Sequence, residues 1–98
     1  MAQLIVLYGH PTDPSAFDDH YTGHHVPLAK TVPGCRAMSW GHLTTLDGSR
    51  PDYYLSAVLT FDSVESLKRS LATPEGQAVA ADVGTFATGG ATVLVQED

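Results

Sequence analysis

Three of the five histidines in this 98-residue chain fall within six positions, as His20, His24 and His25, and Tyr21 lies among them. Histidine has an unperturbed pKa near ~6.5, so it can take up or release a proton close to neutral pH. In a helix, His20 and His24 lie one turn apart, as do Tyr21 and His25, so each pair can meet on the helix surface. This segment is therefore the candidate site for acid–base chemistry.

A helix through this segment has one face that mixes apolar and polar side chains. At ~100° per residue, His20 and His25 lie along the edges of that face, which contains Phe17, Tyr21, His24, Leu28 and Val32. Pro27 lacks an N–H, and its ring crowds the carbonyl of Gly23 four residues earlier. We therefore expect a kink or a loosened turn beside His24 and His25.

The hydrophobic pattern around this segment predicts the elements that position it. An apolar run at residues 4–8 predicts a first strand, and Asp13 and Pro14 predict a helix start, as N-cap and first helical residue. That helix contains the histidines and ends at Pro33 and Gly34. Strands at residues 35–43 and at about 53–61 follow, with Asp47 and Gly48 in the loop between them.

The second half of the chain completes the pattern. A helix opens at Asp62, with Glu65 three positions later as in a capping box, and Pro74 restarts the chain as another helix. A last strand at residues 92–95 follows the glycines at 89 and 90. The order βαββαβ predicts an α+β fold of the ferredoxin-like type, with residues 1–98 as a single domain.

Composition limits the classes of partner and compartment. The formal charge of −6, with only five lysines and arginines, argues against a surface for nucleic acid or anionic membrane. No apolar run approaches the ~20 residues that span a bilayer, and Met1-Ala2-Gln3 lacks the basic region of a signal peptide. The single cysteine, Cys35, excludes an internal disulfide and is expected to pack as a small apolar group. We expect a cytoplasmic protein.

The predicted strands are apolar on both sides. Leu4 and Val6 alternate with Ile5 and Leu7, and the same holds around Val58 and Leu94. A sheet with helices on one side and water on the other should alternate apolar with polar residues. The sequence therefore predicts a homodimer in which the second side of the sheet meets a second copy.

Residues 25–28 form a His-x-Pro-Leu element that is followed by Pro33-Gly34. Further residues of the same pattern are spread over the chain: Leu7-Tyr8-Gly9, Pro11, Phe17, Tyr21, Tyr54, Ala57, Phe61, Pro74-Glu75-Gly76, Asp82 and Phe86. With these residues the chain closely resembles, over nearly its whole length, the EthD family, which is named for ethyl tert-butyl ether degradation; the His-x-Pro-Leu element ending at Pro-Gly is the most specific part. The resemblance implies the dimeric α+β barrel superfamily. Relatives with this barrel include cyclases, dehydratases, decarboxylases and monooxygenases, while EthD proteins themselves are often called reductases.

Tyr21 and His25 are the predicted catalytic residues, because they are polar, adjacent on the helix and match the family motif. His25 would move a proton while the Tyr21 hydroxyl polarises a carbonyl of a small hydrophobic or aromatic ligand. The predicted ligand-binding residues are Phe17, His24, Leu28, Met38, Trp40 and Asp82, the last by its match to the family pattern. The structural alternatives are that His25 hydrogen-bonds a backbone carbonyl freed by Pro27, and that Tyr21 is a core residue.

Metal and cofactor sites are not expected. His20 and His24 have the spacing of a helical metal pair, with His10 or Asp13 as a possible third ligand, but no further metal motif accompanies them. His10 and His42 are interpreted as solvated loop or strand-end residues, with a position at the mouth of a cleft as the alternative. Arg36 and Asp82 are expected to form an ion pair, with substrate binding as the alternative.

The sequence has no G-x-G-x-x-G after a strand and no P-loop. It therefore favours cofactor-independent lyase- or isomerase-type chemistry over nicotinamide-dependent reduction. The alternatives are a non-catalytic carrier dimer and an oxidoreductase, as family naming suggests.

Overall fold

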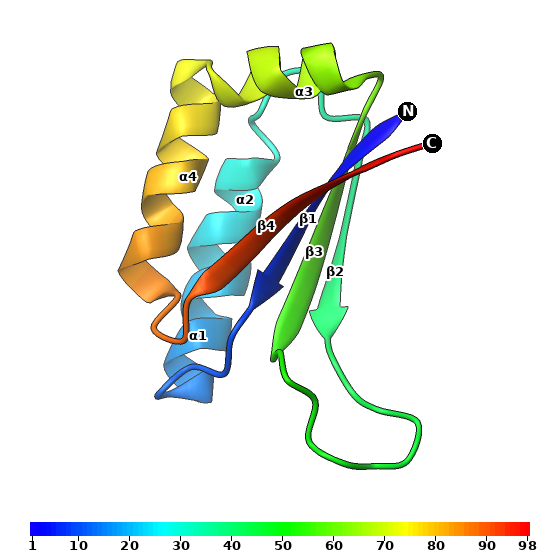
Figure 1. Ribbon diagram of the computed structural model, residues 1–98. Coiled ribbons are helices and arrows are strands. Elements are labelled where there is room, and N and C mark those ends of the chain that lie inside the picture. Colours follow the sequence, from blue (N-terminus) through cyan, green and yellow to red (C-terminus); the bar gives the residue numbers. More distant parts are fainter.

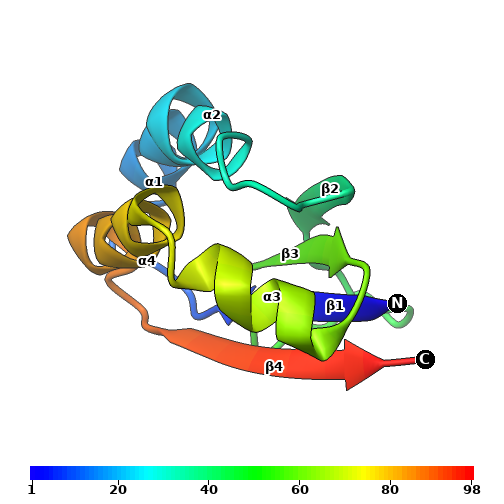
Figure 2. The same cartoon turned by 90° about the horizontal axis from the view of Figure 1, so that it is seen from above.

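The computed structural model describes residues 1–98 as one sheet with helices packed against a single face (Figures 1 and 2). The strands are β1 (Ala2–Tyr8), β2 (Ala37–His42), β3 (Leu55–Phe61) and β4 (Ala91–Glu97). They form an antiparallel sheet in the order β2-β3-β1-β4. The βαββαβ order and the ferredoxin-like fold class predicted from the sequence are confirmed.

The helical layer is built from α1 (Pro14–His20), a π-helical turn η1 (Tyr21–His25), α2 (Val26–Ala29), α3 (Val64–Leu71) and α4 (Pro74–Phe86). Asp13 caps α1 as predicted, and Thr73, directly before Pro74, caps α4. The side chain of each accepts a hydrogen bond from the backbone N–H three residues later. At α3 the cap is Ser63 and not Asp62, because the Ser63 hydroxyl accepts the Ser66 N–H at 3.0 Å. None of these helices has the length and apolar character needed to cross a membrane.

The π-helical turn is the local feature that orients the candidate site. The Val26 N–H bonds to the carbonyl of Tyr21, five residues earlier, in the widened turn that directly precedes Pro27. This confirms the predicted loosening of the helix. In a straight α-helix, two side chains four positions apart point in directions that differ by about 40° around the helix axis. The wider turn removes this difference, so Tyr21 and His25 face the same side.

The widened turn also corrects one expectation about the histidines. Tyr21 and His25 are both buried, with exposures of 0% and 4%, whereas the His24 side chain is 61% exposed. The sequence pattern places His24 on the inward face and His25 on its edge, because that pattern assumes 3.6 residues per turn through the whole segment.

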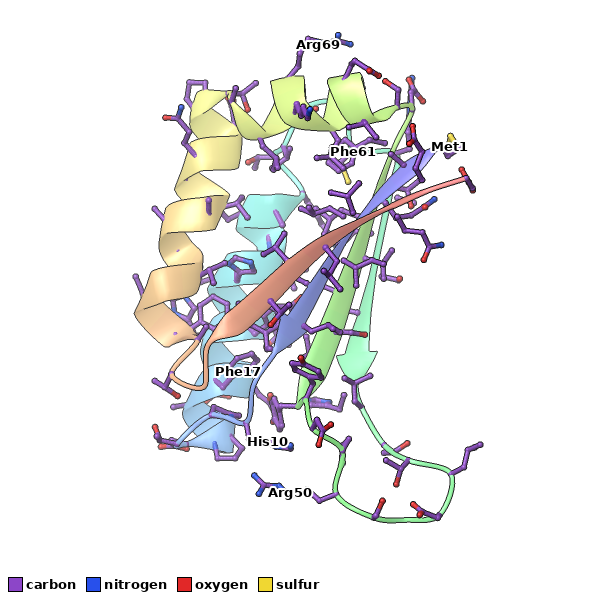
Figure 3. The ribbon with its side chains drawn as sticks, viewed as in Figure 1. Met1, His10, Phe17, Arg50, Phe61 and Arg69 are labelled. Atoms are coloured by element: carbon purple, nitrogen blue, oxygen red, sulfur yellow. The ribbon has the colours of Figure 1, made fainter.

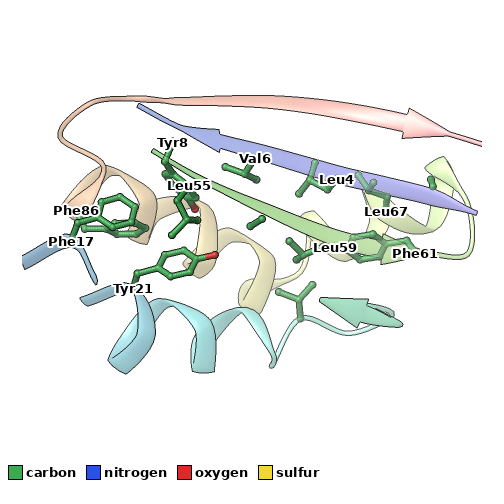
Figure 4. Packing of buried hydrophobic residues seen from close by; sticks show 13 residues of the cluster. Leu4, Val6, Tyr8, Phe17, Tyr21, Leu55, Leu59, Phe61, Leu67 and Phe86 are labelled. Carbon is green, nitrogen blue, oxygen red and sulfur yellow. The ribbon is translucent and has the colours of Figure 1, made fainter. Parts of the chain in front are cut away.

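The core lies between the sheet and the helical layer. Alternate residues of β1 and β3 face the helices, and aromatic side chains of α1, η1 and α4 close one end of the layer (Figure 4). The buried cluster comprises Ala2, Leu4, Val6, Tyr8, Phe17, Tyr21, Val32, Leu55, Ala57, Leu59, Phe61, Leu67 and Phe86.

The opposite face of the sheet is uncovered by any helix (Figure 2). Strand alternation and register place Ile5, Leu7, Val58 and Leu94 on this face, and no charged residue occupies its positions on the four strands. Leu94 is 50% exposed. These four residues form an apolar strip, while the positions around it are uncharged but largely polar: Gln3, Ser39, Ser56, Thr60, Thr92 and Gln96. The second face is thus apolar only in part, and the homodimer stays a prediction.

Candidate functional site

An apolar cavity of about 140 Å³ lies between the sheet and the helical layer. Aliphatic residues of β1, β3, α2 and α4 form most of its wall. Among the lining residues, only Tyr8, Tyr21 and His25 bring polar side-chain atoms. Tyr21 reaches from the helical layer toward the sheet (Figure 4). A dry cavity of roughly 150 Å³ can hold one benzene-sized molecule, so the space suits a small apolar ligand with one polar end.

His25 is held by a carboxylate from a distant part of the chain. Its Nδ1 lies 2.8 Å from Oδ2 of Asp82 on α4. Because an ionised carboxylate only accepts hydrogen bonds, Nδ1–H is the donor, and Nε2 of the neutral ring then carries the lone pair. That Nε2 lies 3.4 Å from the hydroxyl of Tyr8, which donates a long hydrogen bond. The imidazole lone pair therefore lies at the polar end of the cavity, where the Tyr8 hydroxyl occupies it through this long hydrogen bond.

Burial and the carboxylate act on His25 in opposite directions. Burial lowers the pKa of His25 below 6.5 and outweighs the hydrogen bond and charge of Asp82, which raise it. For Asp82, burial alone would raise the pKa, but hydrogen bonds from His25, His20 and Thr85 together lower it below its usual range. The pair at neutral pH is thus a neutral imidazole beside an ionised carboxylate.

Tyr21 contributes a hydroxyl that has no partner. The side chain is fully buried, and its Oη makes no hydrogen bond. Burial, with a smaller effect of Tyr8, raises the pKa of Tyr21 well above its usual range, so the hydroxyl stays protonated. Its ring stacks on that of His25, with centroids 5.4 Å apart. An unpaired buried donor normally costs stability, and a bound ligand oxygen is one group that would satisfy it.

The other two histidines of the segment contact Asp82 away from the cavity. His20 Nε2 lies 3.0 Å from Asp82 Oδ1, and His24 Nε2 lies 3.6 Å from the same oxygen. Neither residue lines the cavity. One buried carboxylate thus faces three imidazoles.

The predicted ligand-binding residues divide into two groups. Met38 lines the cavity with Tyr21 and His25, and Asp82 joins them through His25. The other four do not line it: Phe17 is buried in the aromatic cluster, Leu28 is half-buried, Trp40 is 39% exposed beside the Tyr21 ring, and His24 points outward.

Two pairings differ from the sequence-based expectations. Arg36 pairs with Asp62 at 2.8 Å and not with Asp82, because the backbone of Arg36 bonds to Thr60 at the end of the neighbouring strand, two residues from Asp62. The side chain of His25 bonds to Tyr8 and Asp82, so its hydrogen bonds do not go to a carbonyl freed by Pro27. The thiol of Cys35 is half-buried, and burial raises its pKa.

The remaining histidines lie at the opposite end of the sheet from α3. His10 Nε2 lies 2.7 Å from the carbonyl of Pro51, near Arg50 in the loop between β2 and β3 (Figure 3). His42 Nε2 lies 3.0 Å from Asp18, which also accepts the Tyr54 hydroxyl at 2.8 Å. Burial and this acceptor raise the pKa of Tyr54 to about 12. His10 and His42 therefore hydrogen-bond to Pro51 and Asp18 and do not line the cavity.

Tyr8 is the site residue that sequence reasoning missed. It follows Leu4 and Val6 at the strand spacing of two, so the alternation of β1 already assigns it to the helix-facing side. It is also the last residue of that strand, where a polar tip can reach the end of the cavity. Together these two signals identify Tyr8 as a candidate.

The architecture defines a ferredoxin-like α+β protein with an apolar cavity between sheet and helices and a histidine–aspartate pair at the polar end of that cavity. The EthD domain model matches residues 9–90. The chain belongs to the EthD family.

Relatives agree with this assignment. The chain is 42% identical over 98 residues to the "Uncharacterized 11.0 kDa protein in thcB-thcC intergenic region" of Rhodococcus erythropolis, covering 100% of this chain and 95% of that protein. An EthD family protein from Bacillus halodurans is 35% identical and superposes with a TM-score of 0.94 over 100% of this chain and 98% of that one. A dimeric ferredoxin-like protein from Thermobifida fusca shares the fold at 13% identity, with a TM-score of 0.74 over 99% and 90% of the two chains.

Proposed function

We propose that the cavity binds a small hydrophobic or aromatic compound with a carbonyl or phenolic oxygen, and that His25 transfers a proton to or from this compound without a cofactor. The observation that carries the proposal is the 2.8 Å contact between Nδ1 of His25 and Asp82. It directs the basic Nε2 of a neutral imidazole toward an apolar cavity, where a ligand proton would take the place of the long 3.4 Å hydrogen bond from Tyr8. A general base works best when it is deprotonated at the working pH and aimed at the proton it removes.

The role of Asp82 is to position His25. The carboxylate fixes the tautomer and stabilises the imidazolium that forms when Nε2 takes a proton, as in other histidine–carboxylate pairs. Thr85 supports Asp82, since its hydroxyl lies 3.1 Å from Oδ1 and 2.6 Å from the backbone carbonyl of the same residue. Asp82 is thus held from its own helix as well as by the imidazoles.

Tyr21 supplies the donor for the ligand oxygen. When Nε2 of His25 removes a proton from a carbon next to a carbonyl, negative charge develops on the carbonyl oxygen. A hydroxyl that is protonated, buried and free of other partners stabilises this charge without first giving up a bond. The proton then resides on Nε2, from which it can return to the same carbon, another carbon or a leaving group. Isomerisation, cyclisation and dehydration all share this first step.

The size and polarity of the cavity set the ligand class. With about 140 Å³ and three polar side chains at one end, it suits a single ring or a short branched chain that carries one oxygen. A charged ligand would find no countercharge in the lining other than imidazolium. Small cyclic and aryl ketones are therefore suitable probes.

Deuterium exchange into such ketones tests the proposal. In D₂O, the wild-type protein should accelerate exchange of the α-protons of a ketone that enters the cavity, as followed by NMR. His25→Gln should lower that rate by ~10²-fold or more. His42→Gln is the matched control, because His42 also pairs with an aspartate but lies outside the cavity. Unchanged exchange in a folded His25→Gln variant would contradict the catalytic role, and saturable binding without exchange would favour a carrier.

A further inference from the structure

A second cluster of ligating atoms lies on the outward side of Asp82. His20 Nε2, His24 Nε2 and one carboxylate oxygen of Asp82 all lie within 4.8 Å of one another. The two imidazoles come from adjacent helical turns, and the carboxylate comes from α4. The third ligating residue is Asp82. The sequence spacing suggests His10 or Asp13 for this position, and neither belongs to the cluster.

Both nitrogen–oxygen separations in this cluster suit a transition-metal ion. Zinc binds imidazole nitrogen and carboxylate oxygen at about 2.0–2.2 Å, so neighbouring ligand atoms in tetrahedral or octahedral geometry are roughly 2.8–3.6 Å apart. The two nitrogens lie 3.0 Å and 3.6 Å from Asp82 Oδ1. A set of two histidines and one carboxylate with open positions is a recurrent arrangement for such metals.

The surroundings of Asp82 favour coordination by Oδ1. The other oxygen, Oδ2, accepts from His25 at 2.8 Å, and a carboxylate oriented by a neighbouring donor is typical of metal sites. His20 Nε2 lies 3.0 Å from Oδ1 and 3.1 Å from Oδ2, and the Thr85 hydroxyl lies 3.1 Å from Oδ1. His20 thus contacts both oxygens, whereas the His24 contact is made to Oδ1. The carboxylate is buried, while the side chains of His20 and His24 are 33% and 61% exposed. Thus the carboxylate ligand is held in place by its neighbours, while the two partly exposed imidazoles leave a path for an ion to enter from solvent.

We propose that His20, His24 and Asp82 form a binding site for a divalent first-row transition metal such as Zn²⁺ or Co²⁺, with water in the remaining positions. The metal replaces the proton shared between His20 Nε2 and Asp82. Because neither histidine lines the cavity, the ion does not touch the cavity ligand. It acts on His25 only through Asp82, since a cation on Oδ1 weakens the support that this carboxylate gives to the imidazolium of His25.

Cobalt and zinc titrations of the tag-free full chain, first stripped with chelator, test the site. Co²⁺ should produce saturable visible d–d absorption at one equivalent per chain. Saturating Zn²⁺ should raise the Tm by at least ~5 °C, because a ligand that binds only the folded state stabilises it. His24→Ala should weaken affinity for both ions by ~10-fold or more, and it is expected to fold because His24 is largely exposed.

A second variant and a matched control make the test decisive. His20→Asn should also weaken the affinity, so the result does not depend on a single substitution. His42→Ala removes another exposed histidine that pairs with an aspartate and should leave the affinity unchanged. Absence of saturable binding at millimolar Co²⁺ and Zn²⁺ would overturn the proposal. So would binding that both His24→Ala and His20→Asn leave intact, or that His42→Ala weakens equally.

Discussion

Asp82 Oδ2 lies 2.8 Å from Nδ1 of His25, although the two residues are 57 positions apart in the sequence. This contact joins α4 to the π-helical turn and determines which imidazole nitrogen carries the proton. It also gives each of the three clustered histidines a different environment. His25 is buried at the cavity, whereas His20 and His24 meet the same carboxylate from the solvent side.

Stability should fall in mild acid because of His25. Its pKa is lowered in the folded state, mainly by burial, so the unfolded chain binds more protons over this range. The stability linked to neutral His25 is fully present above the pKa of ~6.5 that histidine has in the unfolded chain. It is lost as the pH falls from that value toward the lower pKa of His25 in the folded protein. Chemical denaturation with chelator present, from pH 8 to pH 5, should show a steeper loss in the wild type than in His25→Gln. Equal slopes would contradict a depressed pKa.

Tyr21→Phe should separate stability from activity. The substitution removes a buried hydroxyl that has no partner, so the free energy of unfolding should stay unchanged or rise by up to ~1 kcal/mol. Ketone α-proton exchange should nevertheless slow, though less than in His25→Gln. Tyr8→Phe is the matched comparison, because it removes a hydroxyl that bonds to His25 at 3.4 Å and should slightly lower stability. Clear destabilisation by Tyr21→Phe would reveal a hydrogen bond that the structure does not show.

Asp82→Asn should lower both the pKa of His25 and the rate of ketone α-proton exchange. The carboxylate raises the pKa of His25 against the effect of burial, so its removal should lower that pKa further. Histidine NMR titration should detect the shift, and the exchange rate should fall by ~10-fold or more because the tautomer is no longer fixed. An unchanged or raised pKa for His25 would contradict the positioning role assigned to Asp82.

The uncovered sheet face should mediate dimerisation. Light scattering at micromolar concentration should report about twice the 10.4 kDa mass of the chain. Val58→Lys places a charge on this face and should shift the mass toward a single chain. Leu46→Lys is the control, since Leu46 is fully exposed in the loop between β2 and β3. A stable monomeric wild-type protein would contradict the homodimer interpretation.

Local sequence signals predict most of the fold. Apolar runs locate the strands, Asp13-Pro14 and Thr73-Pro74 locate two helix starts, and Pro27 indicates the irregular turn. These features depend on residues within a few positions of one another, so the sequence alone contains them. Most element ends shift by one or two residues, as at Ser63, because competing caps lie side by side. The helix that contains the histidines ends at Ala29, four residues before the predicted stop at Pro33.

The site is less accessible to sequence reasoning because its contacts are long-range. The motif points to Tyr21 and His25, but the partner of His25 depends on how α4 packs against the π-helical turn. Charge alone favours Arg36 as the partner of Asp82, whereas strand pairing places Arg36 beside Asp62. The inward-facing histidine is His25 and not His24 because the π-helical turn changes the rotation per residue. A prediction that assumes 3.6 residues per turn does not include this change.

A crystal structure with a bound ketone that undergoes exchange would test the central claim most directly. The decisive measurements are the distances from its oxygen to the Tyr21 hydroxyl and from its α-carbon to Nε2 of His25. We predict an oxygen within hydrogen-bond range and a carbon about 3–3.5 Å from Nε2, as proton transfer requires. A ketone bound outside the cavity, or inside it with its α-carbon turned away from His25, would contradict the account.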